Sequence, residues 1–294
     1  MTINPVNRLQ AQAYQLGSNT VTATNVASLS GTAATPLILD DLIINTLSNI
    51  SPKCELLNNI TQTISTVTDI RVSGQSFFAS NQAMPITAFA SDAKLDGVRS
   101  IGATIDTNQL LEVEIASTKG FSGVDPVSFS CSTAPIPPGG EVVSPNDLPG
   151  SLLSYCFGLG SFVGLNAIPA IAAGVPGVRT FQATCLRDQV TLGRLVGALA
   201  YSGGAAGDES ASQVKITSIK ADGIELLSSR SPGQEGIGFD SVLASASDQT
   251  GLLLNYTLAL NSQVTVEVSN FAAQAANVVM GAFCRAYNPT AFQA

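Results

Sequence analysis

The sequence contains no histidine and no tryptophan, and only 12% of its 294 residues are charged. Without histidine, a catalytic triad with a histidine base cannot form, and neither can most zinc and haem sites. A typical soluble protein carries about 25% charged residues. Here serine, threonine, asparagine, glutamine and glycine fill the polar positions, so little charge repulsion separates neighbouring copies.

Basic residues are also few, and they are not clustered. Residues 1–147 carry 12 acidic and 6 basic side chains, and residues 148–294 carry 9 and 7, which gives the formal net charge of -8. Binding to a phosphate backbone needs grouped lysine and arginine to displace counterions. The sequence therefore predicts no direct, sequence-specific nucleic-acid binding.

The cysteines are odd in number and widely spaced, with no C-x-x-C pair: Cys54, Cys131, Cys156, Cys185 and Cys284. This pattern favours buried thiols that pack as small apolar groups, and a disulfide is the less favoured reading. The first residues lack a basic segment followed by an apolar one, so we expect no signal peptide.

Recognisable catalytic motifs are missing as well. There is no phosphate-binding P-loop, and Gly158, Gly160 and Gly164 are wrongly spaced for a dinucleotide fingerprint. The carboxylate pairs Asp40/Asp41 and Glu112/Glu114 stand without the aromatic residues of a sugar-cleaving cleft. We interpret both pairs as structural, predict no catalytic, cofactor-binding or metal-binding residue and no cofactor, and expect a protein that is not an enzyme.

What the chain does contain is a repeated pattern. An alternating run at 110–115 leads to the apolar run 127–131, and a matching pair appears at 264–268 and 278–284. Glu114 and Glu267 are 153 residues apart, and so are Cys131 and Cys284. The repetition predicts one β unit used twice, in which these residues hold equivalent positions.

A second block is repeated at a spacing of 149. Residues 63–78 alternate, turn at Ser73-Gly74 and continue, and residues 214–227 do the same around Asp222-Gly223. Each copy is predicted to be a β-hairpin with a turn that needs positive φ. The shift from 149 to 153 implies four extra residues in a loop of the second copy.

These patterns predict an all-β fold of two tandem jelly-roll barrels or sandwiches, a duplicated unit with a few short helices and an N-terminal arm. The predicted parts are an arm and short helix over 1–50, a first jelly roll over 51–147, an uncharged inter-domain segment over 148–178 and a second jelly roll over 179–294. The helix is expected at 37–47, because Thr35 can cap it and Pro36 suits its first turn.

The segment 148–178 has no charged residue. Its length would allow a membrane span, but its many glycines and prolines argue against a transmembrane helix. We expect a segment covered by a neighbouring subunit or lying on a lipid surface.

Two similar β units, few charges and no catalytic motif resemble the double jelly-roll major capsid proteins of icosahedral, tailless and often membrane-containing bacteriophages. The resemblance covers the whole chain in architecture but includes no specific motif. It implies a homotrimer that forms a pseudo-hexagonal capsomer and contacts neighbouring capsomers, penton or minor capsid proteins and an internal lipid membrane. It also implies assembly in the host cytoplasm and a place in the virion.

Other functions remain open at this point. An adhesin or fibre protein made of two β-sandwiches would bind glycans and would show exposed aromatic residues or calcium loops. A β-sandwich hydrolase is disfavoured by the missing histidine. A tailed-phage coat protein would need a long charged helix, which the sequence does not predict.

Overall fold

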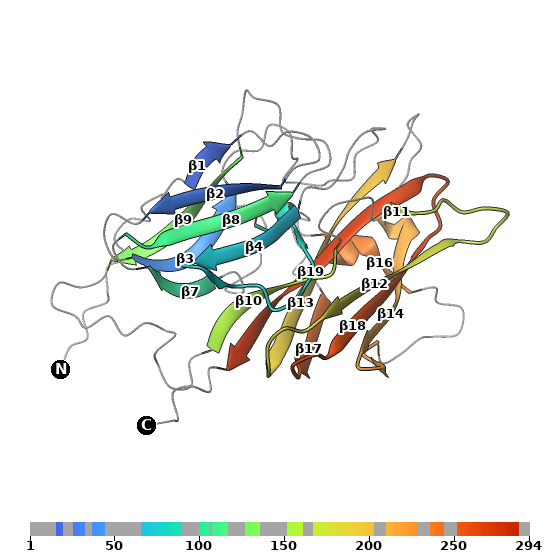
Figure 1. Cartoon of the computed structure of the whole chain (residues 1–294). Helices are drawn as coiled ribbons and strands as arrows, with labels where there is room; N and C mark the ends of the chain where they lie inside the picture. The colour runs from blue at the N-terminus through green and yellow to red at the C-terminus, as the bar shows by residue number, and fades with distance from the viewer. Residues whose placement is uncertain are drawn as a thin grey trace, which may run out of the picture.

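In the computed structural model the chain forms β-sandwiches joined side by side (Figure 1). The structure describes residues 16–19, 26–32, 37–44, 66–89, 100–105, 108–116, 127–135, 152–160, 167–202, 210–227, 236–243 and 252–287.

The first unit packs a sheet of order β1-β9-β3-β7 against one of order β2-β8-β4-β5, with β6 also paired to β4. All the pairings within both sheets are antiparallel. The elements of this unit are β1 (Leu16–Asn19), β2 (Val26–Thr32), β3 (Leu37–Ile44), β4 (Thr66–Val72), β5 (Gln75–Ser76), β6 (Met84–Pro85), the 3-10 turn η1 (Ile86–Phe89), β7 (Ser100–Ile105), β8 (Leu110–Ala116) and β9 (Val127–Pro135).

The second unit repeats this plan with sheets of order β10-β19-β13-β17 and β12-β18-β14-β15. Two short strands lie off these paths, β11 on β19 and β16 on β14. Its elements are β10 (Leu152–Gly158), β11 (Ala167–Ile168), β12 (Gly177–Thr184), β13 (Val190–Ser202), η2 (Ala211–Gln213), β14 (Val214–Ala221), β15 (Ile224–Glu225), β16 (Ile237–Gly238), η3 (Phe239–Val242), β17 (Leu252–Leu258), β18 (Gln263–Asn270) and β19 (Ala275–Tyr287).

The strand order identifies both units as jelly rolls. When the short strands β6, β11 and β16 are left aside, the strands of each unit number one to eight, and both units read 1-8-3-6 and 2-7-4-5. The fold class predicted from sequence is therefore confirmed, including the duplication. Glu114 and Glu267 lie on the seventh strand of their units, and Cys131 and Cys284 lie on the eighth.

The duplication extends to individual turns. Ser73 and Gly74 between β4 and β5 have φ of 49° and 82°, and Asp222 and Gly223 between β14 and β15 have 50° and 82°. The first residue of each turn donates its N–H to the strand alongside, Ser73 to Leu110 at 2.8 Å and Asp222 to Gln263 at 2.9 Å. Both predicted hairpins are thus confirmed, with the positive φ that their turn residues imply.

A repeated bulge explains where the alternation breaks. In β4 the buried apolar residue after Val67 is Ile70, and in β14 the one after Ile216 is Ile219, an odd spacing in each case. The pairing with the neighbouring strand shifts at these points. At the shift, the hydroxyl of Thr68 donates to Oε1 of Glu114 at 2.7 Å, and Thr217 does the same to Glu267 at 2.7 Å.

Near each bulge, one carboxylate ties the two arms of the hairpin. In the first unit, Oδ1 of Asp69 accepts the N–H of Ile70 at 2.8 Å and the hydroxyl of Ser76 at 2.6 Å. In the second unit the acid stands on the other arm. Oε1 of Glu225 accepts the N–H of Ile219 at 2.9 Å, and its Oε2 accepts the hydroxyl of Ser218 at 2.5 Å.

The expected arm and helix over 1–50 were wrong for the residues described there. Residues 37–44 form β3, which is hydrogen-bonded between β9 and β7, and β1 and β2 lie in the region expected to be an arm. The run Leu37-Ile-Leu-Asp-Asp-Leu-Ile-Ile44 fits a helical face, but pairing with two long strands outweighs this weak local preference.

The expected boundary at residue 179 was also wrong. β10 and β11 lie inside the segment 148–178, and β10 pairs with β19 over its whole length. The uncharged character of this part reflects burial in the second sandwich, where Tyr155, Phe157 and Leu159 are each at most 4% exposed. Among the helices in the described parts of the chain, none is long and apolar enough to cross a membrane.

The two equivalent turn glycines give a first test. No atom lies within 4 Å of a Cβ added at Gly74 or Gly223, so alanine there would cost only the strain of positive φ. We expect Gly74→Ala and Gly223→Ala each to lower the free energy of unfolding by about 1 kcal/mol, measured by urea denaturation. Clearly unequal losses would contradict the structural equivalence of the two turns.

Candidate functional site

The two units are held together by a junction between them. Strand β7 of the first unit lies against β10 of the second, and the buried apolar side chains of both units form one continuous cluster (Figure 1). The contact is made chiefly by residues 77–83, which follow β5, and we call this stretch the bridging segment.

The bridging segment pairs with the outer edge of β10 as an added strand would. The N–H of Cys156 donates to the carbonyl of Phe77 at 2.8 Å, and the N–H of Ala79 donates to the carbonyl of Cys156 at 2.7 Å. Farther along, Ala83 and Gly160 exchange two hydrogen bonds of 2.9 and 3.0 Å. The edge of the second unit's sheet is thereby covered, and its backbone groups find partners.

The same segment also reaches the second sheet of that sandwich. The N–H of Leu186, just after β12, donates to the carbonyl of Ala79 at 2.8 Å. The N–H of Thr184 donates to Oδ1 of Asn81 at 3.1 Å. The bridging segment therefore closes the side of the second sandwich where the first strands of its two sheets, β10 and β12, stand next to each other.

A buried serine and a glycine fix the register of this contact. The hydroxyl of Ser80 accepts the N–H of Gly158 at 2.7 Å and donates to the carbonyl of Gly158 at 2.9 Å. A Cβ at Gly158 would lie 2.1 Å from the carbonyl oxygen of Gln82. Position 158 must therefore be glycine for the two backbones to approach this closely.

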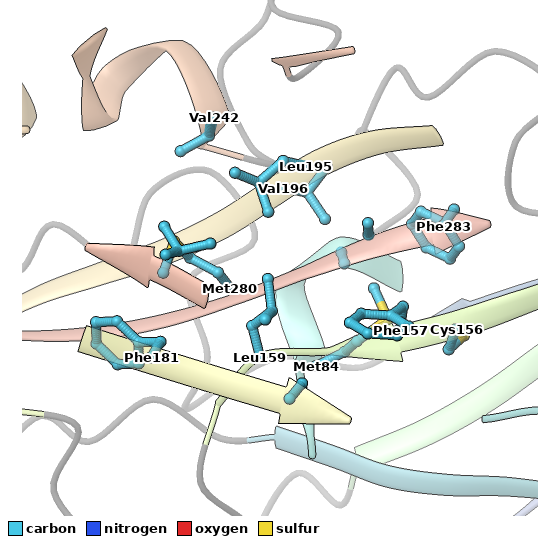
Figure 2. Close-up of a cluster of buried hydrophobic side chains, with 14 of the residues drawn as sticks. Met84, Cys156, Phe157, Leu159, Phe181, Leu195, Val196, Val242, Met280 and Phe283 are labelled. Atoms are coloured by element: carbon cyan, nitrogen blue, oxygen red, sulfur yellow. The ribbon is translucent and has the colours of Figure 1, made fainter. Parts of the chain in front are cut away.

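Large side chains of the first unit fill the space behind this pairing. Phe77 stacks on Tyr155 with ring centroids 5.9 Å apart, and Phe89 meets Phe283 edge to face at 5.6 Å. Figure 2 shows Met84 close to Phe157 in this cluster. Full burial of such side chains contributes about 2–3 kcal/mol each, so the junction holds the two units in one fixed arrangement.

Arg187 adds a polar contact at the margin of the junction. Its guanidinium donates to the carbonyl of Ser76 at 2.6 Å and lies over the ring of Tyr155, 4.4 Å from the centroid. The second unit thus binds both the backbone of the first and the aromatic pair that joins them.

Glu112 and Glu114, which we interpret from the sequence as structural, lie in a cluster of ion pairs. Both carboxylates face Arg71, at 3.7 and 3.4 Å, and Asp69 lies 2.6 Å from the same guanidinium. The four groups are partly exposed on β4 and β8. In the described parts of the chain, no three histidine, cysteine or acidic side chains are grouped so that they could hold a metal ion.

Three cysteines belong to the core around the junction. Cys156, Cys185 and Cys284 are free thiols, each at most 2% exposed. Burial raises the pKa of Cys156 and of Cys284 well above the usual thiol value. This confirms the reading of these three as apolar packing groups; the side chains of Cys54 and Cys131 lie outside the described set.

The junction was not predicted from the sequence. One signal for it was present: no charged residue occurs between Arg71 and Asp92, and two phenylalanines stand side by side at 77 and 78. An exposed hairpin end would carry charges and alternate, so this stretch indicated burial on both faces.

Sequence comparison adds nothing to this picture, because no protein-family model matches the chain and no curated protein matches it. Several solved structures align with it in three dimensions, and two of them are described here. The major capsid protein P2 from bacteriophage PM2 aligns with 94% of this chain and 98% of its own, at 9% identity and a TM-score of 0.39. N-glycanase F (PNGase F) aligns with 94% and 96%, at 10% identity and a TM-score of 0.34.

Substitution of Gly158 tests the junction directly. Gly158→Val would push a side chain into the backbone of the bridging segment, and we expect it to lower the free energy of unfolding by about 3 kcal/mol or more. Gly174→Ala is the control, since its turn is open within 4 Å and only positive φ is strained. Equal, small losses in urea denaturation for both variants would contradict the close approach at Gly158.

The buried thiols give a second test. Because Cys156, Cys185 and Cys284 are covered and their thiols resist ionisation, iodoacetamide at pH 8 should leave them unmodified in the folded protein. Peptide mass spectrometry should find all three alkylated once urea has unfolded the chain. Rapid labelling of any of the three before unfolding would show that the core around the junction is open.

Proposed function

We propose that this protein is a structural protein, the major capsid protein of an icosahedral virus, and that it assembles rather than catalyses. One observation carries the proposal: two jelly rolls of identical strand order are held in a fixed side-by-side arrangement by a shared core within one chain. The resemblance noted from the sequence points to tailless, often membrane-containing bacteriophages.

The duplication would allow such a chain to form an oligomer with nearly hexagonal symmetry. Three copies around a three-fold axis present six similar units, so a homotrimer has a nearly hexagonal outline. Hexagonal outlines tile a surface, and closed symmetric oligomers are the usual products of repeated contacts. For a shell protein, two equivalent scaffolds fused in this way form one unit of such a tiling.

The composition supports assembly. With 12% charged residues, neighbouring copies meet little electrostatic repulsion. In the proposal the partners are other copies of the chain, neighbouring capsomers, penton or minor capsid proteins and an internal lipid membrane. The protein is placed in the virion after assembly in the host cytoplasm, without direct sequence-specific contact to the genome.

Mass measurement tests the proposal. The purified protein in mild buffer should give trimers of about 90 kDa, three times the chain mass of 30.1 kDa, or larger shells. Native mass spectrometry measures the trimer, and negative-stain electron microscopy should show pseudo-hexagonal particles. A stable monomer at high protein concentration would overturn the capsid reading, and a monomer that binds glycans would support a fibre or adhesin.

A further inference from the structure

A projecting β-hairpin is the exposed part of the uncharged segment 148–178. Residues 171–176, Ile-Ala-Ala-Gly-Val-Pro, connect β11 to β12, and Figure 1 shows this connection extending beyond the end of the second sandwich. We call these six residues the apolar tip. Residues 172–175 are all exposed, and Val175 is 67% exposed, the highest value for a large hydrophobic side chain in the described parts of the chain. Burial inside the protein therefore does not account for the absence of charge here.

Hydrogen bonds fix the shape of the apolar tip. The N–H of Ala172 donates to the carbonyl of Val175, and the N–H of Val175 donates to the carbonyl of Ala172, both at 2.9 Å. At the base, the N–H of Ile171 donates to the carbonyl of Ala272 at 2.9 Å. The side-chain amide of Asn270, which is fully buried, donates to the carbonyl of Pro169 at 3.0 Å. A preformed hairpin loses little conformational freedom on binding, and its paired backbone groups keep their partners in apolar surroundings.

The turn of the apolar tip differs in composition from two turns of the same shape elsewhere in the chain. Ala173 and Gly174 have φ of 49° and 80°, which matches the turns Ser73-Gly74 and Asp222-Gly223. Small polar residues and glycine are favoured at such positions, and alanine is strained there. The tip therefore carries a strained methyl group where the other two turns carry a hydroxyl and a carboxylate. This exchange is expected where the turn leaves water, because a polar side chain would then have to be desolvated.

We propose that the apolar tip inserts into the surface of a lipid bilayer. A stable protein–protein interface buries about 800 Å² on each partner, which is more than a projecting tip of six small residues offers. Shallow insertion needs only apolar side chains that reach below the lipid headgroups. Each tip binds weakly, and several tips on one oligomer bind the same bilayer more tightly. This membrane-binding activity goes beyond the proposed capsid function and does not depend on it.

Two cations stand at the same end of the sandwich as the apolar tip. Arg179 follows the tip near the start of β12, and Lys215 lies near the start of β14, on the other side of β18. Their charged groups lie over aromatic rings, 5.6 Å from the centroid of Phe181 and 5.0 Å from that of Phe271. Such side chains suit the headgroup layer beside an inserted segment. The exposed Asp240 of η3 is close by, so anionic lipid should strengthen binding only modestly.

A single introduced tryptophan tests the insertion, because the chain has none of its own. Val175→Trp places the indole in the apolar tip. Leu260→Trp is the matched control, since Leu260 is 53% exposed in the turn before β18, at the opposite end of the sandwich. Vesicles of phosphatidylcholine should shift the emission of Val175→Trp to shorter wavelength, and brominated lipids should quench it. The emission of Leu260→Trp should change in neither experiment.

Charged variants measure how much the tip contributes to binding. Val175→Asp should lower the partition of the full chain onto these vesicles about tenfold or more, because a carboxylate resists transfer into lipid. Leu260→Asp makes the same change of charge at the opposite end and should leave the partition unchanged. Vesicle co-sedimentation measures both. Thermal unfolding should be little affected in either variant, since both side chains are exposed in turns.

Three results would overturn the lipid contact. The first is an emission spectrum of Val175→Trp that vesicles leave unchanged. The second is an equal loss of partition for Val175→Asp and Leu260→Asp. The third is a shift of the Val175→Trp emission that appears without lipid as the protein concentration rises, which would assign the tip to a contact with a second copy. None of these results bears on the capsid function, which is tested by trimer or shell formation in the absence of lipid.

Discussion

The covering of one sheet edge by a segment of the other unit is the contact on which this molecule depends. A jelly roll leaves both outer strands of each sheet with unpaired backbone groups, and burial of those groups without partners is costly. Here residues 77–83 form hydrogen bonds with β10, with the last residue of β12 and with Leu186 just after it. The second sandwich is therefore completed by the first, and the two units cannot be regarded as independent domains on a flexible linker.

Much of the architecture can be inferred from the sequence because the duplication repeats similar residues at a nearly constant spacing. The pairs Glu114/Glu267 and Gly74/Gly223 stand at fixed spacings, and each pair occupies the same strand or turn of its unit. The bulges were not predicted, although the spacing from Val67 to Ile70 breaks the alternation in the same way as that from Ile216 to Ile219. Such local features follow from side-chain periodicity alone.

The junction and the first strands could not be inferred in the same way. Residues 37–44 have a helical pattern, and only the strands on either side, which are distant in sequence, make them β3. Uncharged residues after 148 looked like a connection because burial on both faces removes the alternation that marks a strand. The role of Gly158 cannot be read from the residues around it. A side chain there is excluded by the carbonyl of Gln82, which lies 76 residues earlier in the chain.

The carboxylate that links the two arms of each hairpin stands on a different arm in the two halves. Asp69 with Ser76 in the first unit corresponds to Ser218 with Glu225 in the second, so acid and hydroxyl have changed places while the same backbone N–H is satisfied. Exchange requires two substitutions, and a step with two acids would set like charges against each other. The less costly path passes through two hydroxyls. The hydrogen bond to this backbone N–H therefore requires an acid on one arm of the hairpin and a hydroxyl on the other, but it does not determine which arm carries which.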